Sequence, residues 1–191
     1  MNYYDEHADR YIKDTLGVDM SEQYALFLPY LEQGARILDA GCGSGRDSKA
    51  FLALGYRVDA FDASGEMVQA ARDLTGLAVR QLRFEELDCH RCYDGIWASA
   101  SLLHVPRLHM DAVFLRLHRA LTEGGILYAS FKEREADFES EGRIFTCYTV
   151  EGLLSFLGDI GLFSLLDLQQ SRDLRAGREG ERWLNVVLRR V

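Results

Sequence analysis

The chain has 191 residues, 48% of them hydrophobic, and a formal net charge of −8. This length allows one sizeable core, and no Pro-, Gly- or Ser-rich linker divides it, so we expect a single domain over 1–191. The acidic N-terminus and short apolar runs argue against a signal peptide and a membrane span, which predicts a cytoplasmic protein. The negative charge disfavours nucleic acid as a partner.

Two helices are predicted before the first strand. Apolar and aromatic residues recur at helical spacing over 3–16 and again over 21–32, with Ser21 as the predicted N-cap. We predict that 1–34 forms a helical lid on a Rossmann-like core of 35–191.

Short apolar strands alternate with helices further along the chain. The predicted strands cover 36–40, 56–62, 77–82, 93–100 and 125–131, and the predicted helices cover 46–54, 64–76, 106–121 and 149–161. The runs 162–170 and 181–190 are predicted to form a closing antiparallel hairpin. This alternation predicts a doubly wound α/β fold, mostly parallel, with helices on both faces of the sheet.

The first strand leads into the sequence ILDAGCGSGRD, in which Gly41, Gly43 and Gly45 alternate with other residues. Ligands of open α/β sheets bind beyond the carboxyl ends of the strands, and this turn lies there. Arg46 stands where a dinucleotide fingerprint has its third glycine, which weakens a pyrophosphate site. Asp62 ends the second strand, where a carboxylate can accept hydrogen bonds from both ribose hydroxyls. A ribose without a pyrophosphate fits these features best.

Four segments resemble the ordered motifs of class I S-adenosylmethionine-dependent methyltransferases. They are ILDAGCGSGRD, VDAFDASGEMVQAAR, YDGIWASASLLHV and LHRALTEGGILY, which lie between residues 36 and 131. The stretch GSGRDSKAFLALGYRVDAFDAS is also similar to tellurite-resistance-type methyltransferases. The resemblance implies a seven-stranded sheet of order 3-2-1-4-5-7-6 with an antiparallel last strand. It also implies S-adenosyl-L-methionine as cofactor, S-adenosyl-L-homocysteine as product and a small-molecule methyl acceptor.

The resemblance also implies a set of cofactor-binding residues. Asp39 would help to hold the cofactor ammonium, and Arg46 with the helix N-terminus would hold the carboxylate. Asp62 would bind the ribose, Met67 would pack on the adenine, and Phe84 would lie beside the adenine. The complete predicted set is Asp39, Gly41, Cys42, Gly43, Gly45, Arg46, Asp62, Ala63, Ser64, Met67, Phe84 and Ala98.

Structural roles are the alternative for three of these residues. Asp39 and Asp62 could be carboxylates that only stabilise loops, and Met67 could be ordinary core. Arg83 stands where many relatives have an acid that binds the adenine amino group, so adenine recognition departs from the family pattern here.

Tyr11 and His104 are the candidate catalytic residues. Methyl transfer is an in-line displacement that needs a general base only when the acceptor arrives protonated. His104 follows the fourth strand at the ligand end of the sheet, although it could instead cap the next helix. Aromatic side chains recur every four residues on one predicted helix face, at Tyr3, His7 and Tyr11. This face could close over the cofactor sulfonium as a lid, or it could simply pack against the rest of the protein.

Three polar residues after the fifth strand are candidates for acceptor binding. Lys132 ends that strand, and Arg143 and Tyr148 follow a loop that is mostly acidic. A solvated loop is the alternative.

Cys89 and Cys92 in the sequence CHRC could be half of a zinc site or a redox pair. No second pair of ligands accompanies them, so we predict no metal and reduced cysteines in an exposed turn. Two other functions stay open for the chain: a non-catalytic S-adenosylmethionine-binding domain and a nicotinamide-dependent oxidoreductase.

Overall fold

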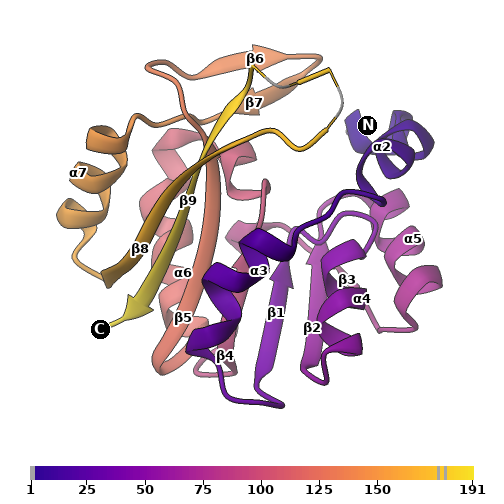
Figure 1. Cartoon of the computed structure of the whole chain (residues 1–191), viewed down its shortest axis with the longest axis horizontal. Helices are drawn as coiled ribbons and strands as arrows, with labels where there is room; N and C mark the ends of the chain where they lie inside the picture. The colour runs from indigo at the N-terminus through magenta and orange to yellow at the C-terminus, as the bar shows by residue number, and fades with distance from the viewer. Residues whose placement is uncertain (1–2, 176, 179) are drawn as a thin grey trace.

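The computed structural model describes residues 3–175, 177–178 and 180–191, so the first two residues of the predicted lid lie outside the described part (Figure 1). The chain begins with helices α1 (Tyr3–Glu6), α2 (Ala8–Thr15) and α3 (Ser21–Phe27), followed by the short 3-10 helix η1 (Leu28–Tyr30).

The predicted first helix is two helices, because the backbone at His7 leaves helical geometry (φ −125°, ψ 25°). Because of this break, residues before and after His7 no longer follow the spacing of one continuous helix. Tyr3 packs on His7 with ring centroids 4.6 Å apart, whereas Tyr4 packs on Tyr11 at 5.0 Å. The prediction that Tyr3, His7 and Tyr11 share one face is therefore wrong.

The N-cap prediction for the third helix is wrong by one residue. Met20 is the N-cap, and Ser21 is the first helical residue, with its N–H donating to the Asp19 carboxylate at 2.9 Å.

Seven strands form the central sheet, in the order β3-β2-β1-β4-β5-β9-β8. Their bounds are β1 (Arg36–Ala40), β2 (Arg57–Asp62), β3 (Arg80–Gln81), β4 (Tyr93–Ala98), β5 (Leu121–Lys132), β8 (Phe163–Arg172) and β9 (Arg182–Arg190). Strand β9 is antiparallel to both β5 and β8, and the pairings among the first five strands are parallel. The predicted strand order and antiparallel last strand are confirmed.

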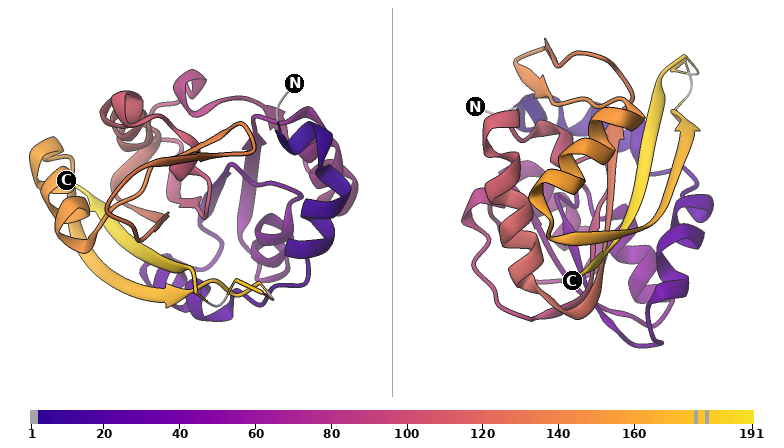
Figure 2. Two further views of the ribbon diagram at one scale, coloured as in Figure 1. Left: turned by 90° about the horizontal axis from the view of Figure 1, so that it is seen from above. Right: turned by 90° about the vertical axis from the view of Figure 1, so that its left-hand side faces the viewer.

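Helices lie on both faces of the sheet, as Figure 2 shows. They are α4 (Arg46–Ala53), α5 (Gly65–Thr75), α6 (Met110–Ala120) and α7 (Val150–Ile160), with short 3-10 turns η2 (Phe84–Glu86), η3 (Leu102–His104) and η4 (Arg107–His109). Successive residues of β5 enter opposite cores: Leu127 packs in the cluster with α6 and α7, and Tyr128 in the cluster with α3 and α4. This alternation is the period of two that a strand covered on both faces requires.

Two short strands, β6 (Phe138–Ser140) and β7 (Arg143–Phe145), form a separate antiparallel hairpin over the upper end of β5 (Figure 1). The sequence predicted a loop there. Phe138 of β6 stacks on Phe145 of β7 at 4.5 Å between ring centroids, and this pair holds the two strands of the hairpin together.

The prediction of reduced cysteines is wrong for one pair, because the structure places a disulfide between Cys89 and Cys92. Both sulfurs are therefore bonded to each other rather than available as metal ligands. Cys42 and Cys147 are free thiols.

Candidate functional site

One cavity lies at the carboxyl ends of β1, β4 and β5, with about 1060 Å³ of space counting its open mouth. Its wall combines the glycine loop after β1, the N-terminal helices, the end of β5, the β6–β7 hairpin and the β8–β9 connection. The predicted residues that line it are Tyr11, Gly41, Cys42, Gly43, Arg46, His104, Lys132 and Arg143. Those outside its lining are Asp39, Gly45, Asp62, Ala63, Ser64, Met67, Phe84, Ala98 and Tyr148.

Each of the three loop glycines lacks a side chain for a different structural reason. All three have positive φ, which favours glycine. A Cβ on Gly41 would lie 2.5 Å from the Ser101 Cβ, and one on Gly43 would lie 3.6 Å from the Tyr11 ring. Gly45 instead allows α5 to approach α4, because its Cβ would meet Ala71 at 3.1 Å. Only the first two glycines face the cavity.

Four N–H groups of the glycine loop donate hydrogen bonds within the protein. The N–H groups of Gly41 and Cys42 both donate to the Phe61 carbonyl at 2.9 Å. The Gly43 N–H donates to Asp62 Oδ2 at 2.8 Å. The Gly45 N–H is bonded to the Cys42 carbonyl. These donors are thus already used within the protein.

Asp62 joins the glycine loop to the start of α5. Its second oxygen accepts the Ser64 N–H at 2.9 Å. Burial raises the pKa of Asp62, while hydrogen bonds from the backbone of Ser64 and Gly43 oppose that rise. The Phe84 ring lies on the other side of the loop, packed on Phe61 at 5.2 Å.

Helix α1 covers this edge of the site. The Ser64 hydroxyl, which accepts the Met67 N–H as the N-cap of α5, also donates to Asp5 Oδ1 at 2.5 Å. A segment from the chain start therefore lies beside the carboxylate predicted to bind ribose.

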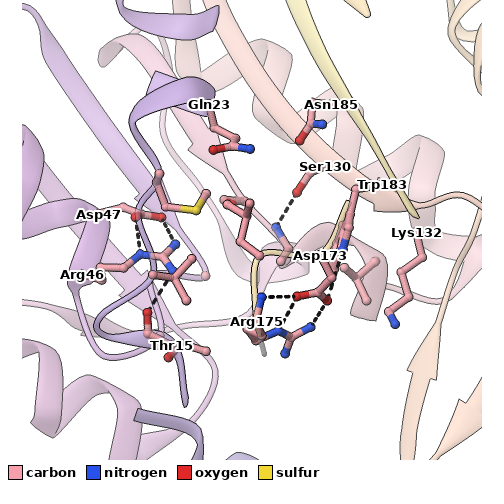
Figure 3. A pocket seen from close by; sticks show the side chains of 18 of the residues that line it. Thr15, Gln23, Arg46, Asp47, Ser130, Lys132, Asp173, Arg175, Trp183 and Asn185 are labelled. Atoms are coloured by element: carbon pink, nitrogen blue, oxygen red, sulfur yellow. Dashed lines mark hydrogen bonds and ion pairs between the residues drawn. The ribbon is translucent and has the colours of Figure 1, made fainter. Parts of the chain in front are cut away.

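Asp47 is a site residue that the sequence reasoning missed. Its carboxylate accepts hydrogen bonds from the Tyr24 hydroxyl (2.7 Å), Trp97 Nε1 (2.8 Å) and two nitrogens of Arg46 (2.7 and 2.9 Å). Figure 3 shows the Arg46–Asp47 pair on one wall of the cavity. Its position next to Arg46 in the first turn of α4 was a local signal, whereas its partners Tyr24 and Trp97 come from α3 and β4.

Two predicted ligands of the cofactor already have protein partners. Arg46 is bonded to Asp47 and donates to the Thr15 carbonyl at 3.2 Å. Asp39 is buried and accepts the Ser48 hydroxyl at 2.6 Å. Burial and the nearby Asp47 charge raise the pKa of Asp39. The cofactor roles of Arg46 and Asp39 stay predictions.

His104 joins helix α1 to the β6–β7 hairpin. Its Nδ1 lies 2.9 Å from the Ile144 carbonyl, and its Nε2 lies 2.7 Å from the Tyr4 hydroxyl. A carbonyl oxygen only accepts, so Nδ1 carries the proton and Nε2 accepts from Tyr4. Burial lowers the pKa of His104 to about 4, so the ring is neutral near pH 7. The partner Tyr4 was not among the predicted residues.

The low pKa of His104 predicts a pH effect on stability. Above pH 6.5 the ring is neutral in both states, and its contribution to stability is complete. Between 6.5 and about 4 the unfolded chain binds a proton that the folded chain does not. The free energy of unfolding should therefore fall with falling pH in this window, by up to about 1.4 kcal/mol per pH unit. Denaturant titrations from pH 7 to pH 4 should show a shallower fall in His104→Gln, and identical slopes would contradict the assignment.

The residues predicted to bind the methyl acceptor lie in two different places. Lys132 and Arg143 line the cavity, where Arg143 lies 3.5 Å over the Tyr3 ring. Tyr148 instead packs in the core against Phe131, beneath Arg107. Assigning Tyr148 to the same site was wrong because β7 ends before it and the chain turns inward toward α7.

Two negative findings concern the described residues alone. No three His, Cys, Asp or Glu side chains gather there as a metal-binding group. No described helix has the length and apolar character to cross a membrane.

Residues 37–125 match the model of the methyltransferase domain family. The ubiquinone biosynthesis O-methyltransferase of Xanthomonas oryzae pv. oryzae is 35% identical over 109 residues, which are 53% of this chain and 44% of that protein. A second enzyme of that name, from Methylocella silvestris, is 33% identical over 56% of this chain and 44% of its own length. The chain thus spans less than half the length of these curated relatives.

A solved structure resembles nearly the whole fold. The 1,6-didemethyltoxoflavin-N1-methyltransferase of Burkholderia thailandensis, with 1,6-didemethyltoxoflavin and S-adenosylhomocysteine bound, superposes with a TM-score of 0.80 at 24% identity, covering 98% of this chain and 84% of that one. At this identity the likeness establishes the fold alone. Residues 37–125, just under half of the chain, are thus similar to the methyltransferase domain family, and the sheet order and the glycine loop agree with that similarity.

Proposed function

We propose that this protein transfers a methyl group from S-adenosylmethionine to a small-molecule acceptor. The observation that carries the proposal is a single cavity that joins the family's glycine loop to the Tyr4–His104 pair beneath the N-terminal helices. Relatives named O-methyltransferases and a similar fold solved with S-adenosylhomocysteine support it. The negative net charge favours a small molecule over nucleic acid as the acceptor.

The residues at the loop fit the cofactor. A carboxylate at the end of β2 suits the ribose hydroxyls, and the buried Phe84 ring lies beside the Gly41 turn. When bound, the cofactor supplies an activated methyl group on a sulfonium. What the chain contributes is orientation of the reactants and exclusion of water, and these can account for much of the rate of an in-line displacement.

Tyr4 and His104 form a proton path for acceptors that arrive protonated. Neutral His104 accepts at Nε2 from the Tyr4 hydroxyl, and both residues line the cavity. The Tyr4 hydroxyl can accept a proton from the acceptor while it passes its own to His104. Tyr11 then packs against Tyr4 as part of the lid instead of acting as a base.

Turnover tests this proposal and separates it from a non-catalytic binding domain. The protein is incubated with methyl-labelled S-adenosylmethionine and a panel of small acceptors, and labelled product and S-adenosylhomocysteine are quantified. We expect stoichiometric formation of both with at least one acceptor. Cofactor binding without transfer to any member would favour the binding-domain alternative.

Asp62→Ala should weaken S-adenosylhomocysteine binding by about 1.5–3 kcal/mol for each charged hydrogen bond lost. The matched control is Asp59→Ala on the same strand, whose carboxylate pairs with Arg36 at 2.7 Å on the surface. Calorimetry should give an unchanged dissociation constant for that control. An unchanged constant in Asp62→Ala would remove Asp62 from the ribose site.

A further inference from the structure

The cavity wall has a charge opposite to that of the chain. The chain has 22 Lys and Arg but 30 Asp and Glu. Among the described residues that line the cavity, six are cationic and two are acidic. The cationic ones are Arg46, Lys132, Arg143, Arg172, Arg175 and Arg178, and the acidic ones are Asp47 and Asp173. An acidic protein has thus gathered positive charge around this cavity.

The two lining acids each neutralise one of these cations. Asp47 pairs with Arg46 at 2.7 Å on the glycine-loop side. Asp173 pairs with Arg175 at 2.5 Å on the opposite wall, and both pairs are visible in Figure 3. Arg143 also has an acidic partner, Glu141, at 2.6 Å. The positive excess therefore comes from Lys132, Arg172 and Arg178.

Lys132 is only partly compensated. Its ammonium is bonded to Glu181 Oε2 at 2.6 Å, but the other oxygen of Glu181 binds Arg134 at 2.7 Å. One carboxylate thus serves two cations. The Lys132 ammonium also lies 5.7 Å from the Trp183 ring, so the lysine is held in place beside an aromatic surface.

Arg172 and Arg178 lie where β8 ends and in the turn toward β9. Both side chains are exposed and line the cavity. Within the described part of the chain, neither has a carboxylate at ion-pair distance, unlike Arg175 between them. Two guanidinium groups at a cavity mouth can bind an oxyanion in bidentate fashion.

The cofactor does not account for this charge. S-adenosylmethionine carries an ammonium and a sulfonium but one carboxylate, so it is itself a net cation, and a positive wall repels it. We propose that Arg172 and Arg178, together with Lys132 of the same cavity wall, bind an oxyanion group of the methyl acceptor. The acceptor is then a small molecule with a carboxylate or phosphate. This inference rests on the proposed function and adds the substrate class.

Matched pairs of ligands test the inference on protein saturated with S-adenosylhomocysteine. The pairs are 4-hydroxybenzoate with 4-hydroxybenzamide, and phenyl phosphate with phenol, each measured by calorimetry at constant ionic strength. We expect the anion of at least one pair to bind about tenfold or more tightly than its neutral partner, as one charge-assisted hydrogen bond predicts. The inference is overturned if neither anion binds more tightly than its neutral partner.

Variants assign the effect to the two arginines. The double substitution Arg172→Gln with Arg178→Gln should remove most of the preference for the anion and leave the neutral ligand unchanged. The control is Arg119→Gln, because Arg119 is an exposed residue of α6 outside the cavity lining. This variant also removes a positive charge, but away from the cavity, and should keep the preference for the anion. A full preference in the double variant would overturn the inference. Failure to saturate with S-adenosylhomocysteine would instead contradict the proposed function.

Discussion

Asp47→Ala is expected to lower the free energy of unfolding by about 3–5 kcal/mol, the range for breaking a buried ion pair by removing one partner. The Asp47 side chain is 8% exposed and that of its partner Arg46 is 22% exposed. The substitution leaves Arg46 without its ion pair and also leaves the Trp97 and Tyr24 donors without an acceptor. Denaturant titration measures the loss.

Two further variants isolate the role of this carboxylate. Asp47→Asn keeps an acceptor for the neutral donors but loses the charge, so its loss should be intermediate. Asp73→Ala, whose exposed carboxylate accepts the Gln69 amide, should change stability by less than about 0.5 kcal/mol. If Asp47→Ala lowered the free energy of unfolding no more than this control does, the hydrogen bonds of Asp47 would not hold α3, α4 and β4 together.

Deletion of residues 1–14 should leave the protein folded while abolishing most methyl transfer. The deletion removes the Tyr4–His104 and Asp5–Ser64 hydrogen bonds and keeps Thr15, which binds Arg46. Water would then reach the sulfonium, and the acceptor would lose one wall. We expect S-adenosylhomocysteine affinity within about tenfold of the full chain, because the predicted ribose and adenine contacts lie on the core.

Hydrogen exchange tests the lid before an acceptor is known. The amides of 3–16 should exchange faster without S-adenosylhomocysteine than with it, as expected for a segment that opens locally. Amides of β4 and β5, in the middle of the sheet, serve as the internal control. Equal protection of 3–16 in both states would mean that these helices are a permanent part of the core.

The sequence predicted the sheet well because its signals are local. The strands β1, β4 and β5 are apolar runs bounded by turn residues, and their alternation with helices limits the topology. Ser64 and Gly76 were correctly placed at the ends of α5, where Ser64 caps the Met67 N–H and Gly76 has φ 74°. Caps and turns depend on a few neighbouring residues, so they can be read from sequence.

The site was predicted less completely because its contacts join distant segments. Asp47 meets Trp97 fifty positions along the chain, and Tyr4 meets His104 across a hundred. No spacing rule reports such pairs. The helix break at His7 placed Tyr4, and not the expected Tyr3, against Tyr11. The end of β8 and the turn after it brought arginines into the cavity from the segment between the two predicted hairpin runs.

Calorimetry with S-adenosylhomocysteine and with NAD is the most direct test of the proposed function. The G-x-G-x-G loop and Asp62 predict saturable binding of S-adenosylhomocysteine and no measurable binding of NAD, since no third glycine follows at the fingerprint spacing. Saturation by NAD with no heat from S-adenosylhomocysteine would contradict the assignment of this cavity to methyl transfer.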